Sequence, residues 1–215
     1  PDHHEIHIGE LALRSEQIEW RTPASQPAAV RYAGNRIEIQ NLQLANADQR
    51  ITATGVVGSN SDTLRIHVDN VDVAQLDTLL LGDGRLAGRL TGDADVSGSP
   101  SALRVSSNFA LTKGAFRTYM FDALSGTMDY TPSGLALDVK LQQTPTEWIT
   151  AKGLAPATLF RPTPPGVDEH DAGRLGGALD VQITSSDIGL GFVQGFTPYV
   201  TNVTGTMQAN VRVTG

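Results

Sequence analysis

The chain carries few residues of the types that perform chemistry, and their spacing does not assemble a catalytic site. His3, His4 and His7 form the only histidine cluster, and on a strand Glu5 and His7 would point to the same side. Imidazole and carboxylate groups can share a metal ion. A frayed terminus with solvated imidazoles explains this cluster better, so we expect no metal site and no cofactor.

Acidic and glycine-rich segments carry no catalytic signature either. Gly82 to Gly88 lacks the lysine and hydroxyl residue of a phosphate-binding loop, which favours a turn or bulge. Asp93 and Asp95 alternate with apolar residues and should face solvent, whereas glycoside cleavage needs two acids that converge across a cleft. His67 lies out of phase with its apolar neighbours, which predicts a place on the polar face. The sequence therefore predicts that the protein is not an enzyme.

Composition excludes other classes of function. Sixteen basic and twenty-three acidic residues give the 215-residue chain a net charge of −7, without a basic run that could bind nucleic acid. The absence of cysteine excludes disulfides and thiolate metal sites. No stretch approaches the roughly 20 apolar residues of a membrane helix. The abrupt start at Pro1 and the strand-like end at Gly215 lead us to expect a piece of a longer protein.

Alternation of apolar and polar residues dominates the chain and predicts strands almost throughout, each with one apolar face. A one-residue slip at Gln40-Asn41 indicates a β-bulge, and turn sequences such as Thr131 to Gly134 are typical of hairpins. The residues that we predict to line one continuous apolar face are Ile37, Ile39, Ile51, Leu64, Ile66, Val68, Leu86, Leu90, Val96, Leu103, Val105, Phe109, Leu111, Leu135, Leu137, Val139, Ile149, Leu179, Val181, Ile183, Val203, Met207, Val211 and Val213.

Helix signals are scarce. The exception is Val71 to Gly82, where Asp72 can cap a helix, apolar residues recur at helical spacing and a glycine ends the pattern. The proline-rich segment 156–177 has no periodicity and is predicted to be an inserted loop. Phe192 to Pro198 lies among glycines, and we hypothesise that it forms an apolar flap.

The sequence also repeats itself. Tyr32 to Ile39 aligns with Tyr130 to Leu137, and at the same offset Ile51 to Gly55 aligns with Ile149 to Gly153. Similar matches continue to Gly98 and to Gly215. We predict one continuous repeat segment, 1–215, with a first unit at 5–98 and a second at 103–215 that contains the loop insertion 156–177. Tandem units of this kind extend one sheet or stack on each other.

The order of these motifs resembles the TamB branch of the AsmA-like superfamily. The resemblance rests on Leu64 to Gly98, Leu103 to Phe116, Leu124 to Tyr130 and Leu179 to Gly215, which consist of glycines and alternating aliphatic residues. It implies an all-β fold in which a long antiparallel sheet curls into a U-shaped trough, or β-taco, with one or two short helices.

The resemblance also implies a function and a location. Family members are anchored in the inner membrane of diderm bacteria, cross the periplasm and are thought to conduct phospholipid along an apolar trough towards the outer membrane. The partners implied are phospholipid acyl chains and, for the full-length protein, an outer-membrane barrel like TamA. The inner-membrane anchor would lie outside this segment.

Two other functions fit the same sequence. One is a structural or adhesive β-array with a closed, dry core that binds no lipid. The other is a scaffold that assists outer-membrane protein assembly by offering its strand edges to nascent strands.

Overall fold

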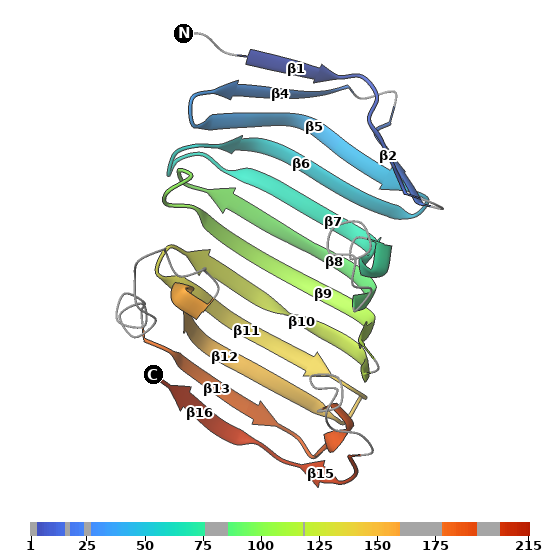
Figure 1. Cartoon of the computed structure of the whole chain (residues 1–215), viewed down its shortest axis with the longest axis vertical. Helices are drawn as coiled ribbons and strands as arrows, with labels where there is room; N and C mark the ends of the chain where they lie inside the picture. Colours follow the sequence, from blue (N-terminus) through green and yellow to red (C-terminus); the bar gives the residue numbers. More distant parts are fainter. Residues whose placement is uncertain are drawn as a thin grey trace.

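The computed structural model describes residues 4–15, 18–23, 27–75, 86–117, 119–159, 178–192 and 203–215. This part of the chain is all-β (Figure 1): fourteen strands form one antiparallel sheet and two form a small second sheet. The elements are β1 (His4–Ile8), β2 (Ala12–Ser15), β3 (Ile18–Arg21), β4 (Ala28–Ala33), β5 (Arg36–Asn46), β6 (Gln49–Val57), β7 (Leu64–Asp72), β8 (Leu86–Ser97), β9 (Arg104–Phe116), β10 (Tyr119–Thr131), β11 (Gly134–Gln142), β12 (Trp148–Pro156), η1 (Ala157–Leu159), β13 (Asp180–Ser185), β14 (Ile188–Gly189), η2 (Leu190–Phe192), β15 (Thr206–Met207) and β16 (Asn210–Thr214).

Strands β4 to β13 pair in chain order, as expected of a meander. β1 extends the sheet beyond β4, and β16 extends it beyond β13. The β2–β3 hairpin joins the side of the sheet through one pairing, between Arg21 of β3 and Ala45 of β5. The predicted all-β fold with one long antiparallel sheet is confirmed. At about 4.8 Å per strand, the path from β1 to β16 spans roughly 50 Å.

Three β-bulges interrupt the pairing, in β5, β7 and β9. Each has a residue with positive φ: Asn41 (54°), Asn70 (52°) and Lys113 (50°). The bulge predicted at Gln40-Asn41 is therefore confirmed. A bulge increases the local twist and bends its strand. In Figure 1, β5 and β6 cross the sheet and then turn downwards on the right.

The predicted helix starts later than expected. Val71 and Asp72 are the last residues of β7, and residues 73–75 are helical. Val71 belongs to the strand because it pairs with Leu90 of β8. Asp72 does cap the helix, since its Oδ1 accepts a hydrogen bond from the backbone N–H of Ala74 at 3.1 Å. Residues 76–85, the rest of the predicted helix and part of the predicted turn at 82–88, lie outside the described residues.

The predicted proline-rich loop also starts later than expected. β12 continues to Pro156, which pairs with Gly134, and residues 157–159 form η1. Proline has no backbone N–H to donate, and none is needed on the β13 side, because β13 pairs only with residues 149–154 of β12. Residues 160–177 of the loop and 193–198 of the hypothesised flap lie outside the described residues. No helix in the described ranges is long and apolar enough to cross a membrane.

Gly55 in β6 and Gly153 in β12, which the predicted repeat aligns, have similar surroundings. Their φ angles are 123° and 152°, in a region that residues with a Cβ rarely adopt. A Cβ on Gly55 would lie 2.2 Å from the carbonyl oxygen of Thr63, and one on Gly153 would lie 2.0 Å from that of Asp180. Both glycines thus allow the next strand to approach closely.

We predict that Gly153→Ala lowers the free energy of unfolding by about 2 kcal/mol or more, because it adds backbone strain to a steric clash. Chemical denaturation followed by circular dichroism measures the change. Gly9→Ala is the control, since a Cβ there would meet nothing within 4 Å. Equal stabilities of the two variants would contradict the close approach.

Candidate functional site

One face of the large sheet consists of apolar rows that run from strand to strand. Directly paired residues of antiparallel strands point to the same face, so the register defines four rows. Row 1 is Val30, Ile39, Gly55, Leu64, Val96, Val105, Tyr130, Leu135 and Ala155. Row 2 is Leu42, Ala53, Ile66, Ala94, Ser107, Met128, Leu137, Gly153, Val181 and Val213. Row 3 is Leu44, Ile51, Val68, Gly92, Phe109, Gly126, Val139, Ala151, Ile183 and Val211. Row 4 is Val71, Leu90, Leu111, Leu124, Leu141, Ile149 and Ser185.

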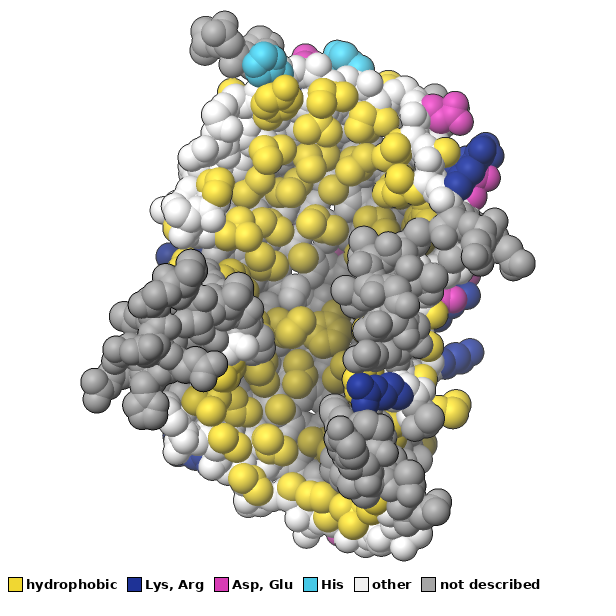
Figure 2. All heavy atoms as spheres, in the orientation of Figure 1, with side chains coloured by type: hydrophobic (Ala, Val, Ile, Leu, Met, Phe, Trp, Pro, Cys, Tyr) yellow, Lys and Arg dark blue, Asp and Glu magenta, His cyan; other side chains and the backbone are white. Residues whose placement is uncertain are grey.

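These rows contain no charged residue within the described strands. In Figure 2, hydrophobic side chains spread over the sheet along most of its length, and charged side chains are confined mainly to the margins. Most members of the rows are half-buried, and the last two, Val211 and Val213 on edge strand β16, are 50% and 39% exposed. We call this surface the apolar face.

Eighteen of the residues predicted from the sequence lie in these rows: Ile39, Ile51, Leu64, Ile66, Val68, Leu90, Val96, Val105, Phe109, Leu111, Leu135, Leu137, Val139, Ile149, Val181, Ile183, Val211 and Val213. Ile37 pairs with Tyr32 next to row 1, and Leu86 pairs with Phe116 at the start of β8. Leu179 directly precedes β13, where its N–H and C=O bond to Gly215. Leu103 directly precedes β9.

Val203 and Met207 are not brought into the rows. Their alternation with Val211 and Val213 predicted one strand, but Val203 lies in no strand and Met207 of β15 pairs with Ile188 of β14 in the small sheet. The side chain of Ser185 gives the reason. Its N–H donates to the carbonyl oxygen of Ala209 at 2.9 Å, but its Oγ, not its carbonyl oxygen, accepts the N–H of Ala209 at 2.8 Å, and the paired register of β13 and β16 ends at Thr184 and Asn210.

The apolar face is hollowed near its middle, where its small side chains lie. Gly92, Ala94 and Ser107 help to line a concavity of about 270 Å³ whose exposed surface is almost wholly apolar. Its other lining residues are Ile66, Val68, Leu90, Asp93, Asn108, Phe109 and Met128. The sequence analysis missed this hollow because the alternation showed where large apolar residues would point, not where small ones would be neighbours on adjacent strands.

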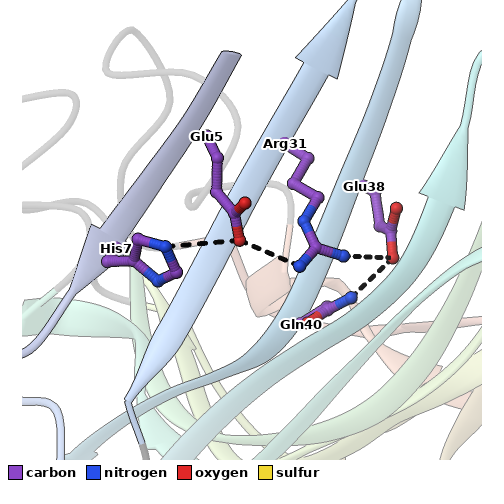
Figure 3. Close-up of polar contacts among 5 residues, drawn as sticks. All are labelled: Glu5, His7, Arg31, Glu38 and Gln40. Carbon is purple, nitrogen blue, oxygen red and sulfur yellow. Dashed lines mark hydrogen bonds and ion pairs between the residues drawn. The ribbon is translucent and has the colours of Figure 1, made fainter. Parts of the chain in front are cut away.

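The opposite face is polar and carries ion pairs between strands. In Figure 3, Arg31 of β4 lies between Glu5 of β1 and Glu38 of β5, with nitrogen–oxygen distances of 2.9 and 3.7 Å. His7 Nε2 also lies 3.4 Å from Glu5 Oε1, and Gln40 donates a 2.7 Å hydrogen bond to Glu38. The hydrogen bond with Glu5 raises the pKa of Arg31 above its usual value.

Similar pairs continue along this face to the far edge of the sheet. Lys152 Nζ bonds to Asp138 at 2.6 Å, and Arg212 bonds to both carboxylate oxygens of Asp180 at 2.7 Å. The hydrogen bond from Arg212 lowers the pKa of the Asp180 carboxyl group. The Lys152–Asp138 and Arg212–Asp180 pairs are exposed to solvent, so each stabilises the fold little.

The candidate chemical residues of the sequence lie on this polar face or at the edge of the sheet. As predicted, His67 is on the polar face, where Nδ1 lies 2.7 Å from Asp93 Oδ1, and Asp95 pairs with Arg65 at 3.6 Å. His4 stacks on Tyr32, with ring centroids 4.9 Å apart. Among the described residues, no group of three or more potential ligands could hold a metal ion. His3 lies outside them.

One rim of the apolar face is closed, and we call it the sealed rim. Three connections lie on this rim, on the right in Figure 1: the β2–β3 hairpin, the helical residues 73–75 and the small sheet of β14 and β15. Each has a buried side chain in it or next to it: Trp20 (2% exposed), Val71 (0%) and Ile188 (0%). Between them, Leu111, Tyr119 and Phe121 form a buried cluster against which Val73 packs.

Buried polar side chains join these connections to the neighbouring backbone. Thr22 Oγ1 accepts the N–H of Leu11 at 2.8 Å, Gln49 Oε1 accepts the N–H of Asp72 at 2.7 Å, and Ser185 Oγ accepts that of Ala209. Thr22, Gln49 and Ser185 are the buried polar residues of the described chain. The hydroxyl of Tyr119 adds a fourth link, because it donates to Gln143 in the β11–β12 turn at 3.3 Å. The sealed rim is thus held by hydrogen bonds as well as by packing.

Comparison with known proteins leaves the family open, since no protein-family profile, no curated protein and no solved structure matches the chain.

We predict that Gln49→Ala lowers the free energy of unfolding by about 1–3 kcal/mol, because the N–H of Asp72 loses its buried acceptor. Gln49 also donates to Gln75 at 3.3 Å, so hydrogen exchange should speed up at residues 72–75 in particular. The control is Gln43→Ala in β5, a half-buried glutamine opposite Thr52, with an expected change below about 0.5 kcal/mol. Unchanged exchange at Asp72 in the Gln49 variant would contradict the role of this side chain.

Proposed function

We propose that the apolar face binds the acyl chains of phospholipid, and that the protein conducts phospholipid between two membranes. The observation that carries this proposal is the set of four uncharged rows, which continue over neighbouring strands for most of the length of the sheet. An apolar sheet face needs an apolar partner. The described elements cover mainly one rim, which leaves much of this face to a ligand.

The energetics favour a lipid that moves along the apolar face rather than one that is held at a single site. Each CH₂ group gains about 0.8 kcal/mol on burial, so a sixteen-carbon tail would lose on the order of 12 kcal/mol on passing from bilayer to water. A continuous aliphatic surface removes most of this barrier. A pocket that selects one ligand places a few polar groups among apolar ones, whereas the only polar side-chain groups in the rows are the hydroxyls of Ser107, Ser185 and Tyr130. A lipid tail would therefore bind weakly and repeatedly to successive strands along the apolar face.

We further propose that the sheet is curled into a U-shaped trough with the apolar face inside. The bulges at Asn41, Asn70 and Lys113 bend three alternate strands, and the elements at the sealed rim cover the same ends of their strands. The aligned glycines Gly55 and Gly153 support a tandem origin of the sheet.

The resemblance to the TamB branch of the AsmA-like superfamily adds a cellular location and a partner to this proposal. On that basis, the protein is a periplasmic segment of a bridge that is anchored in the inner membrane of a diderm bacterium and supports outer-membrane biogenesis. The full-length protein would then work with an outer-membrane barrel like TamA. A role in binding also agrees with the polar face, where His67 and Asp95, the residues considered for chemistry, form exposed ion pairs with Asp93 and Arg65.

A second candidate is a scaffold module that assists outer-membrane protein assembly or adhesion without lipid transport. The observation that favours it is strand β2, which within the described chain pairs with β3 alone and whose Leu13 is 46% exposed. An exposed edge offers unpaired N–H and C=O groups to another strand. Mass spectrometry of organic extracts separates the two functions, since only the conduit should co-purify with phospholipid.

We predict that Val68→Glu removes most of the co-purifying phospholipid, because it places a charge in row 3 at the lining of the hollow. Thr54→Glu is the matched control: Thr54 is exposed on the other face and lies opposite Arg65, so lipid content should stay at the wild-type level. Thermal unfolding checks that both variants fold. If Val68→Glu does not fold, Val211→Glu tests the same row at a half-exposed position. Wild-type lipid content in a folded row 3 variant would contradict the proposal.

We also predict that Ala94→Phe slows transfer of a fluorescent phospholipid between vesicles several-fold, because the ring fills the hollow between Ile66 and Met128. Ala136→Phe is the control, since Ala136 is exposed on the opposite face of β11. Equal transfer rates of the two variants would show that the hollow is not on the path.

A further inference from the structure

The two rims of the apolar face differ in a way that bears on how a lipid reaches it. At the sealed rim, buried residues of three connections cover the ends of the strands. At the opposite rim, the turn at 58–63 connects β6 to β7 and the turn at 98–102 lies between β8 and β9; the structure describes both in full. We call these two turns the serine rim.

The serine rim is polar and ordered by its own hydrogen bonds. Ser59 and Ser61 pair through their hydroxyl groups at 3.0 Å, as Ser99 and Ser101 do at 3.1 Å. The N–H of Gly98 donates to the carbonyl oxygen of Ser59 at 3.0 Å, which links the two turns. Hydroxyl groups both donate and accept hydrogen bonds, so this rim suits the polar head of an amphiphile, which stays in water.

The distance between the two rims fits one acyl tail. Leu90 and Leu111 mark where the sealed cluster begins, and seven residues separate Leu90 from Ser97 at the serine rim. At about 3.3 Å per residue this is roughly 23 Å. A lipid tail spans one leaflet of the hydrocarbon core, about 15 Å. A tail that lies along β8 and β9 would thus cross the hollow and end before the sealed cluster.

We propose that phospholipid enters the apolar face sideways, over the serine rim, with its tail along β8 and β9 towards the sealed rim and its headgroup at the 58–63 and 98–102 turns. This inference rests on the proposed function and adds the side of access and the direction of the tail. Movement along the protein is then a series of sideways steps from one strand pair to the next, with the headgroup in water throughout.

The two ends of β9 provide a matched test. The chain has no cysteine, so Ser101→Cys at the serine rim and Lys113→Cys, two residues beyond Leu111, can each carry one bimane fluorophore. Both residues are exposed. Two lysophosphatidylcholines serve as quenchers, one with a nitroxide on the choline headgroup and one with a nitroxide near the end of the acyl chain. Lipid transfer by each labelled variant confirms that the label leaves the protein active.

The headgroup nitroxide should quench the fluorophore at position 101 several-fold more strongly than that at 113, and the acyl nitroxide should show the opposite preference. If the acyl nitroxide quenches but the headgroup nitroxide acts equally at both positions, or more strongly at 113, access over the serine rim is wrong while lipid binding stands. If neither probe quenches at either position, the proposed function fails and the inference fails with it.

Discussion

The structure depends on the register of its antiparallel strands. Since neighbouring residues of a strand point to opposite faces, a slip of one residue would exchange the two faces of that strand. Each of the three bulges adds one residue to a strand, and the rows continue beyond them: Ile39 and Leu42 both face the apolar side across the bulge at Asn41. Register and bulges together keep the apolar face free of charge.

A sheet with a half-exposed apolar face needs stabilisation from other sources. The polar face supplies exposed ion pairs, each of which contributes little. The sealed rim contributes more, because Trp20, Val71 and Ile188 are fully or almost fully buried there. Gln49 satisfies a buried backbone N–H at the same rim. Large buried side chains of the described residues therefore gather at the sealed rim, while the opposite rim buries Leu64, Ala155 and Ala157.

This division gives the face two properties that a lipid conduit needs. The rows are continuous, so a hydrocarbon chain meets a similar surface on each strand, and the hollow above Gly92 and Ala94 makes room for it. Neighbouring turns at the opposite rim are polar, as shown by Ser59 and Ser99. Apolar and polar zones therefore lie side by side across the sheet, which matches the form of an amphiphile.

The sequence by itself determined the features that depend on neighbouring residues: the all-β class, the bulge at Asn41, the polar position of His67 and the side to which most apolar residues point. Only the tertiary structure decided the features that join distant residues, such as the cluster of Leu111 with Phe121, the hollow at Ala94 and the departure of Met207 from the large sheet. The physical reason is that alternation reports the orientation of a side chain within its own strand. Which side chains become neighbours depends on the pairing of strands, and on polar side chains that compete for the same backbone groups.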